Sequence, residues 1–223
     1  MKPALLLSGG KSRRLGFDKA TVAVGKQTCI NTVSDVLKDA GLFPIIEVGR
    51  GFSDLKFIRE PNLGEGPLGA IVFGFEYFKE VGYSGPLAVV SCDLPYLNKG
   101  AVEKIVNSSV SQSVVAISQN RKQPLCAKWS QWDLEIAKSK FLQGERSLKW
   151  FPHGDAIFLE AKSEFRDCGG ELNFSDIDTK DDYDRLLQVL RRNSFRHDKL
   201  DLSAIENSSL SHYGLNQTTA GQF

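Results

Sequence analysis

Seven short apolar runs alternate with segments of helical periodicity, and this alternation constrains the fold of the 223-residue chain more than any other feature. Several of the runs are apolar on both faces, as strands are when helices cover both sides of a parallel sheet. The predicted strands span residues 3–8, 44–49, 55–60, 86–93, 113–118, 125–129 and 155–160. The pattern therefore predicts a three-layer α/β sandwich with a mostly parallel sheet.

Three further stretches have the spacing of amphipathic helices. The first has an apolar stripe from Ile30 to Ala40 and ends at Gly41, which suits a C-terminal cap. The second starts near Pro67, because proline is favoured in the first turn of a helix. The third spans residues 179–192, with acids in its first turn and arginines in its last, as the helix dipole favours. We therefore predict one folded domain over residues 1–191.

The composition changes after this last helix. Residues 192–223 are rich in Asn, Ser, Gln and Thr with scattered single apolar residues. Such a segment lacks the apolar surface to fold alone. We expect this tail to be disordered, or ordered only against a partner.

Charge and cysteine content exclude several classes of protein. The formal net charge of +1 provides no basic field for nucleic acid or for a membrane surface. No apolar run approaches the roughly 18 residues of a spanning helix. The four cysteines are far apart without a C-x-x-C pair, and no leader precedes the first strand. A reduced, cytoplasmic protein that binds neither nucleic acid nor membrane is expected.

The first predicted strand ends in Ser8-Gly9-Gly10, and positive charges follow at once. Glycine lacks the Cβ atom that keeps a phosphate away from backbone N–H groups, and ligands of parallel sheets bind at the carboxyl ends of strands. The cations that follow are Lys11, Arg13, Arg14 and Lys19. A plain turn with a solvated charged face is the alternative for an isolated Gly-Gly. The position after the first strand favours a phosphate site.

Asp93 ends the most apolar predicted strand, and Pro95 stops that strand two residues later. A carboxylate beside a phosphate needs a cation between them, so we hypothesise that Mg²⁺ bridges Asp93 and the phosphates of a nucleotide. A turn or helix-capping aspartate is the alternative. Asp176 and Asp178 precede the last predicted helix; either is a candidate second carboxylate near the metal, and Asp178 is also a candidate helix cap.

Two other segments have weaker signals. The G-x-G-x-x-G match at residues 64–69 contains Pro67 and begins several residues after its strand, so we interpret it as a helix start near a ligand and not as a dinucleotide fingerprint. Lys122, Gln123 and Pro124 lie between two predicted strands. They form either a loop that contacts a second substrate or a plain hairpin turn.

Together these motifs resemble the molybdenum cofactor guanylyltransferase family, within a larger class of nucleotidyltransferases with a Rossmann-like sheet. Residues 7–19, LSGGKSRRLGFDK, match the family pattern L-A-G-G-x-S-x-R-M-G-x-D-K with Ser8 for Ala and Leu15 for Met. The segments GPLGAI at 66–71, CDLPYL at 92–97 and QGERSLKWF at 143–151 are similar to three further family segments. The resemblance covers about residues 4–191 and leaves the tail uncovered.

The resemblance implies transfer of GMP from GTP to the terminal phosphate of molybdopterin, with or without molybdenum, and release of pyrophosphate. It implies Mg²⁺ as cofactor, with Asp93 as its ligand. The nucleotide-binding residues it implies are Leu7, Ser8, Gly9, Gly10, Lys19, Gly49, Glu60, Gly66 and Asp93. The catalytic residues expected are Arg14, Lys19 and Asp93, of which Arg14 and Lys19 stabilise the leaving pyrophosphate.

One departure from the family concerns the acceptor. Where the family tends to have N-x-N-T, this chain has Asp176-Ile177-Asp178-Thr179, and two acids facing a pterin phosphate need a metal or Arg146 to offset them. The Gly-Gly pair is similar to guanylyltransferases, whereas cytidylyltransferase relatives more often have Ala-Gly. The alternatives are a related enzyme with CTP or another phosphorylated acceptor, or a non-catalytic nucleotide-binding chaperone. Molybdoenzymes or their chaperones are further candidate partners.

Overall fold

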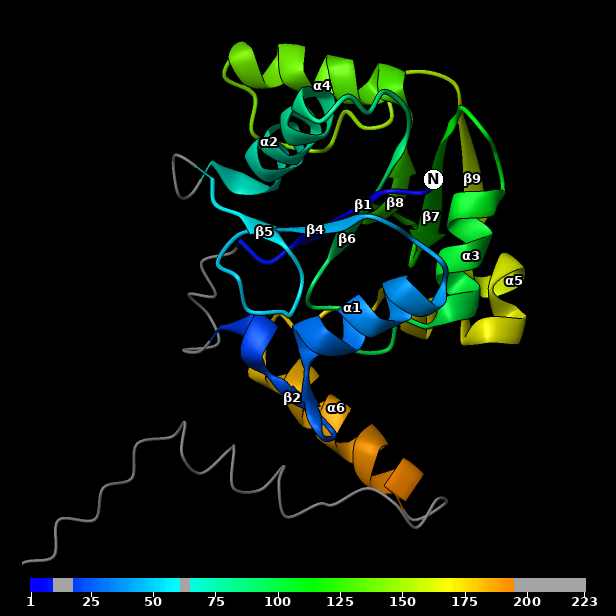
Figure 1. Cartoon of the computed structure of the whole chain (residues 1–223). Helices are drawn as coiled ribbons and strands as arrows, with labels where there is room; N and C mark the ends of the chain where they lie inside the picture. Colours follow the sequence, from blue (N-terminus) through cyan, green and yellow to red (C-terminus); the bar gives the residue numbers. More distant parts are fainter. Residues whose placement is uncertain (10–17, 61–64, 195–223) are drawn as a thin grey trace, which may run out of the picture.

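A computed structural model describes residues 1–9, 18–60 and 65–194 of the chain (Figure 1). Its main sheet has seven strands in the order β5-β4-β1-β6-β8-β7-β9. The strands are β1 (Ala4–Leu7), β4 (Ile45–Val48), β5 (Phe57–Ile58), β6 (Leu87–Ser91), β7 (Ser113–Ser118), β8 (Arg121–Trp129) and β9 (Ala156–Glu160). Strand β8 runs antiparallel to both of its neighbours, and the other pairs are parallel. The mostly parallel sheet is therefore confirmed.

Helices surround the sheet. They are α1 (Cys29–Asp39), α2 (Gly66–Glu80), α3 (Lys99–Asn107), α4 (Gln131–Leu142), α5 (Ala161–Glu164) and α6 (Lys180–Ser194), with the 3-10 helices η1 (Lys19–Thr21), η2 (Arg166–Cys168) and η3 (Gly170–Phe174). A small hairpin joins β2 (Ala23–Val24) to β3 (Gln27–Thr28). The three predicted helices are confirmed as α1, α2 and α6, whereas α3 and α4 have no counterpart among the predicted elements.

Strand β1 shows how the three layers form. Successive side chains of a strand point to opposite faces, so Ala4 and Leu6 pack with α1 and α3, while Leu5 and Leu7 pack with α2 and α4. All four side chains are buried. Figure 1 shows α2 and α4 on one face of the sheet, with α1, α3 and α5 on the other. The predicted three-layer α/β sandwich is confirmed.

The segment Lys122–Pro124 is not a loop, and that prediction is wrong. It lies inside β8, and the turn before it is made by Gln119 and Asn120, both with positive φ. The register between β7 and β8 shifts across this segment. Proline has no N–H to donate, so Pro124 is tolerated at such a bulge. A proline that marks a bulge inside a strand looks the same in sequence as one that ends it.

The described part of the chain ends within the region of the predicted tail. Helix α6 runs to Ser194, and residues 195–223 lie outside the described residues. Within residues 1–9, 18–60 and 65–194, no helix has both the length and the apolar character needed to cross a membrane. All four cysteines are unpaired.

Candidate active site

A pocket of about 210 Å³ opens where β1 and β6 end. These strands are parallel neighbours with Leu7 opposite Ser91, so their carboxyl ends lie at one edge of the sheet. Leu125, in the bulged part of β8, adds an apolar wall, and the first turn of α2 contributes Pro67. The predicted site residues that line the pocket are Leu7, Ser8, Gly9, Lys19 and Asp93.

Two glycines at this edge differ in what an added side chain would meet. A Cβ at Gly49, which has a φ of +150°, would overlap the Ser8 hydroxyl and lie 2.8 Å from the Gly9 nitrogen. The packing of the chain itself therefore requires Gly49. A Cβ at Gly9 would meet nothing closer than Glu60 Oε2, at 3.7 Å. The space beside the Gly9 backbone is therefore open, and a ligand in the pocket can approach the backbone there.

Lys19 joins the acidic groups of the pocket. Its ammonium lies 3.1 Å from Asp93 Oδ2 and also pairs with Asp178. Partial burial alone lowers the pKa of Lys19, but the carboxylates of Asp93 and Asp178 outweigh this effect and raise the pKa above its usual value. The Ser91 hydroxyl donates to Asp93 Oδ1 at 2.6 Å and orients that carboxylate. Lys19 is thus a fixed positive charge at neutral pH.

The chain before α6 reaches Asp93 through Ile177. The Ile177 N–H donates to the Asp93 carbonyl at 3.2 Å, and its side chain is buried in a cluster with Val22 of the segment after η1. The flanking Asp176 and Asp178 are then held beside Asp93, with one oxygen of each of the three carboxylates within 4.8 Å of the others. Burial, and next the charges of Asp178 and Asp93, raise the pKa of Asp176. Three carboxylate oxygens are a donor set that fits a hard cation such as Mg²⁺.

Helix α6 has a cap of its own, so the capping alternative for Asp178 is wrong. The Thr179 hydroxyl accepts from Asp182 N at 3.2 Å, and Asp182 Oδ2 accepts from Thr179 N at 2.8 Å. This is a capping box, and it leaves Asp178 to Lys19. Arg146 does not take the role expected for it, because its ion partner within the described residues is Glu65, at 2.8 Å.

Glu60 places another carboxylate beside Gly9, just after β5. Its Oε1 atom is buried without a hydrogen-bond partner among the described residues. Burial, and next the charge of Glu65, raise the pKa of Glu60. An acceptor left unpaired in this way costs free energy, so it suits a ligand that donates hydrogen bonds.

Glu47 is a buried carboxylate at this edge that the sequence reasoning missed. It lies fully buried in β4 and accepts hydrogen bonds from Ser8 and from the backbone N–H groups of Gly51, Phe52 and Ser53. Burial alone raises the pKa of Glu47, but hydrogen bonds from Ser53, Ser8 and the backbone outweigh it and lower the pKa below its usual value. A glutamate inside the apolar run IIEV is a sequence signal that points to such a residue.

The remaining predicted residues fall in three places. Gly49 and Glu60 border Gly9, as described above. Gly66 begins α2 with a φ of +77°, beside the pocket residue Pro67. Gly10 and Arg14, with the neighbouring cations Lys11 and Arg13, lie outside the described residues.

Comparisons with known proteins identify the family of the chain. Residues 4–150 match the family described as the MobA-like NTP transferase domain. A Clostridium perfringens protein named "Probable molybdenum cofactor guanylyltransferase" is 26% identical over 204 residues, with coverage of 84% of this chain and 96% of that protein.

Solved structures share the fold. The molybdopterin-guanine dinucleotide biosynthesis protein A of Archaeoglobus fulgidus has a TM-score of 0.69 at 19% identity, covering 85% of this chain and 99% of its own. The 4-diphosphocytidyl-2C-methyl-D-erythritol synthase of Anaerococcus prevotii has a TM-score of 0.60 at 11% identity, covering 86% and 98%. At such identities the likeness shows the fold alone. The sequence match over residues 4–150 goes further: the chain belongs to the MobA-like NTP transferase family and is a nucleotidyltransferase.

Proposed function

We propose that this nucleotidyltransferase transfers GMP from GTP to the terminal phosphate of molybdopterin, with or without molybdenum, and releases pyrophosphate. The observation that most supports the proposal is the meeting of Lys19, Asp93 and Asp178 at a pocket whose other wall is Ser8-Gly9. A fixed cation, a set of acids and bare backbone at one pocket suit a reaction between two polyanions. The names of the relatives supply the guanylyl and molybdenum cofactor parts of the proposal.

The triphosphate would lie between Gly9 and the start of α2. Pro67 and Ala70 of this helix line the pocket, and no side chain in the described part of the chain caps its N-terminus. The first backbone N–H groups and the positive end of the helix dipole are therefore available to phosphate oxygens. Lys19 adds a full positive charge on the same pocket.

Glu60 supports guanine as the base. Guanine presents an N1–H and an adjacent exocyclic amino group, which together match the two oxygens of a carboxylate. Cytosine has no such neighbouring pair of donors. Because Glu60 Oε1 has no partner among the described residues and its Oε2 faces Gly9, we assign this side chain to guanine recognition.

The three carboxylates of Asp93, Asp176 and Asp178 would hold Mg²⁺. A divalent ion bound there neutralises phosphate oxygens and polarises the phosphoryl group. Asp93 is oriented for this role by Ser91. The pairing of Asp178 with Lys19 also removes part of the repulsion that the two acids would exert on an anionic acceptor.

In the proposed reaction, an oxygen of the acceptor phosphate attacks the α-phosphorus of GTP in line. The bond from the α-phosphorus to the bridging oxygen breaks, and its electron pair leaves with pyrophosphate. The acceptor is already ionised, so no general base is needed. Lys19 stabilises the charge on the leaving group, and from the sequence alone we assign Arg14 to the same task.

Isotopic labelling tests the reaction. Purified protein with Mg²⁺ and molybdopterin should move the label of α-³²P-GTP into a pterin product, while the label of γ-³²P-GTP should appear in pyrophosphate. Transfer of the γ-label to the acceptor, or of neither label, would contradict the proposal. Another phosphorylated acceptor is the second candidate, favoured by Asp176 and Asp178 in place of the amide side chains of the family pattern.

We also propose a cytoplasmic location, which the four unpaired cysteines support. Molybdoenzymes or their chaperones would then receive the product. Co-purification of the full chain with such an enzyme tests this part.

A further inference from the structure

Glu47 is a buried carboxylate whose partners among the described residues are all hydrogen-bond donors. Its Oε1 accepts from the N–H groups of Gly51 and Phe52, each at 2.9 Å, and from the Ser8 hydroxyl at 2.5 Å. Its Oε2 accepts from Ser53 N at 2.9 Å and from Ser53 Oγ at 2.6 Å. Donors on both oxygens hold the group ionised, and together they fix the segment after β4.

The Ser8 hydroxyl connects this carboxylate to the glycine backbone of the pocket. It donates to Glu47 and accepts from Arg50 N at 3.2 Å. Next to it, Gly49 packs so closely on Ser8 and on the Gly9 nitrogen that no side chain fits at Gly49. The position of Gly9 is therefore set by the segment that Glu47 organises.

Arg50 extends the same line of contacts to Lys19. Its Nη1 lies 2.9 Å from Asp18 Oδ2. The other oxygen of Asp18 accepts from Ala20 N at 3.1 Å and caps η1, the short helix that begins with Lys19. A series of hydrogen bonds, joined by the covalent structure of Arg50, thus runs from the interior of β4 to Ala20, the residue next to Lys19.

We propose that Glu47 is a positioning residue for the nucleotide site, which acts through Ser8 on the Gly9 backbone and through Arg50 and Asp18 on Lys19. The inference rests on the proposed function, in that Gly9 and Lys19 are taken to bind the triphosphate. Glu47 does not line the pocket, so its effect on turnover must pass through these contacts. The family pattern has alanine at the position of Ser8, so the Ser8–Glu47 contact is not part of that pattern.

The main test is Glu47→Gln in the full chain. An amide nitrogen cannot accept from Ser53 or from the backbone, so the segment after β4 loses its fixed position. Because a displacement of about 1 Å can cost up to about 100-fold in rate, we expect kcat/KM for GTP to fall between about tenfold and 100-fold.

Asp133→Asn is the matched control. Asp133 is as fully buried as Glu47 and accepts from Ser113 Oγ at 2.6 Å and from His153 N at 2.7 Å, but at the other edge of the sheet. We expect its melting temperature to fall as for Glu47→Gln, with kcat/KM unchanged. Equal losses of kcat/KM in the two variants, or wild-type kcat/KM in Glu47→Gln, would overturn the proposal.

Arg50 supplies a variant that does not threaten the fold, since its side chain is 47% exposed. Arg50→Met should lower kcat/KM several-fold at an unchanged melting temperature, and Arg50→Lys should restore part of the loss. Combined with Glu47→Gln, the losses should be less than multiplicative because both changes break one series of contacts, whereas adding Asp133→Asn should leave the loss caused by Arg50→Met unchanged. Multiplicative losses in the pair with Glu47→Gln would overturn the route through Arg50.

Failure of the proposed function is recognised separately. If the wild-type chain transfers no GMP, binding of GTP with Mg²⁺ is measured instead, and Glu47→Gln should weaken it while Asp133→Asn does not. That outcome rejects the reaction and keeps the positioning role. A wild-type chain that neither binds nor turns over GTP rejects both.

Discussion

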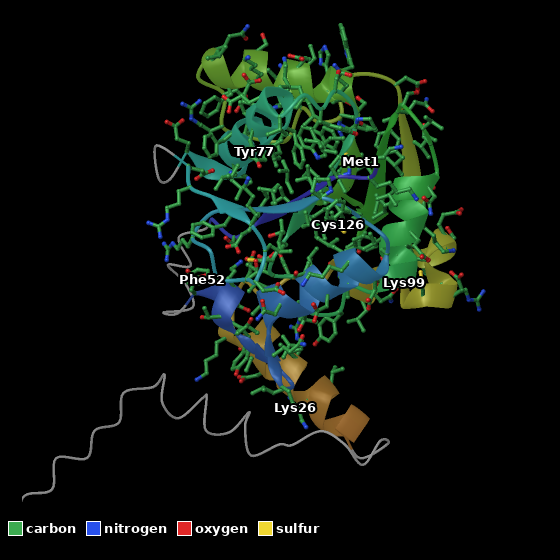
Figure 2. The ribbon with its side chains drawn as sticks, in the orientation of Figure 1. Met1, Lys26, Phe52, Tyr77, Lys99 and Cys126 are labelled. Atoms are coloured by element: carbon green, nitrogen blue, oxygen red, sulfur yellow. The ribbon has the colours of Figure 1, made fainter. Side chains whose placement is uncertain are left out.

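Glu47 and Asp133 are two carboxylates that are equally buried but lie at opposite ends of the parallel strands. Both are fully buried, Glu47 at the carboxyl edge of the parallel strands and Asp133 at the amino edge. Figure 2 shows Phe52, whose N–H donates to Glu47, well apart from Met1, which precedes β1. Equal burial therefore allows the two edges to be compared directly.

The hydrogen-bond partners of Asp133 form a local network that does not lead to the pocket. Its oxygens accept from the hydroxyls of Ser113 and Ser130 and from the N–H groups of His153 and Gly154, and it caps α4 with Ser130. At the carboxyl edge the contacts continue outward instead, to Asp18 in the lining of the pocket. Glu60 lies at the same edge, and its Oε1 has no partner among the described residues. We therefore expect the contacts at the amino edge to stabilise the fold and those at the carboxyl edge to position groups that bind a ligand.

The largest effect is expected from Lys19→Met. Loss of one preorganised cation should lower kcat by about 10² to 10³-fold, or roughly 2.7–4 kcal/mol in the barrier. Steady-state rates of pyrophosphate release measure it, and Lys26→Met, an exposed lysine in the hairpin between β2 and β3, is the control. A wild-type kcat in Lys19→Met would contradict a catalytic role for the carboxyl edge.

Glu60→Gln should alter the choice of base. Loss of one carboxylate contact to guanine is worth about 1–3 kcal/mol, so the preference of the protein for GTP over inosine triphosphate, which lacks the exocyclic amino group, should narrow in this variant. Equilibrium binding of the two nucleotides measures it. Glu76→Gln is the control, because its Oε1 is also without a partner among the described residues while its Oε2 pairs with Lys138 of α4. An unchanged preference in Glu60→Gln would contradict the assignment.

Asp133→Asn should act on stability alone. The amide nitrogen cannot accept from the hydroxyls or N–H groups that face it, so the free energy of unfolding should fall by about 1–3 kcal/mol. Urea denaturation measures this change, and kcat/KM for GTP should stay at the wild-type value. A loss of kcat/KM here would mean that the two edges do not differ in the way described.

The smallest effect expected is on the pH dependence of the free energy of unfolding at acidic pH. The folded-state pKa of Glu47 lies below its unfolded value, so the stability it contributes is present above the unfolded pKa and is lost as the pH falls through the folded pKa. The free energy of unfolding of the wild type should therefore fall more steeply than that of Glu47→Gln below about pH 4. Urea denaturation between about pH 3 and 5 would show parallel curves if Glu47 is not held ionised.

The sequence predicts which residues lie at the carboxyl edge better than it predicts the tertiary contacts that hold them there. Buried apolar strands fix the sheet, and Gly9 and Asp93, which follow strand ends, fall at one pocket because parallel strands end together. The meeting of Asp176 and Asp178 with Lys19 depends on Ile177, whose hydrogen bond to Asp93 joins distant parts of the chain. No local pattern contains such a contact.

Two other features escape sequence reasoning for physical reasons. Pro124 ends a strand by its usual preference, yet a shift of register between β7 and β8 accommodates it and leaves Leu125 in the wall of the pocket. A glutamate is unfavourable in a buried strand. The burial of Glu47 is stable only because Ser8 and the segment after β4 donate hydrogen bonds to its carboxylate. In both cases tertiary partners decide the outcome.

Pyrophosphate release by the purified full chain is the most direct measurement of what this pocket does. With Mg²⁺, we expect release from GTP and not from CTP or ATP, only when molybdopterin is present, and lost in Asp93→Asn but not in Asp133→Asn. Release from CTP in preference to GTP, or release that persists in Asp93→Asn, would contradict the assignment of the donor and of the carboxyl edge as the active site.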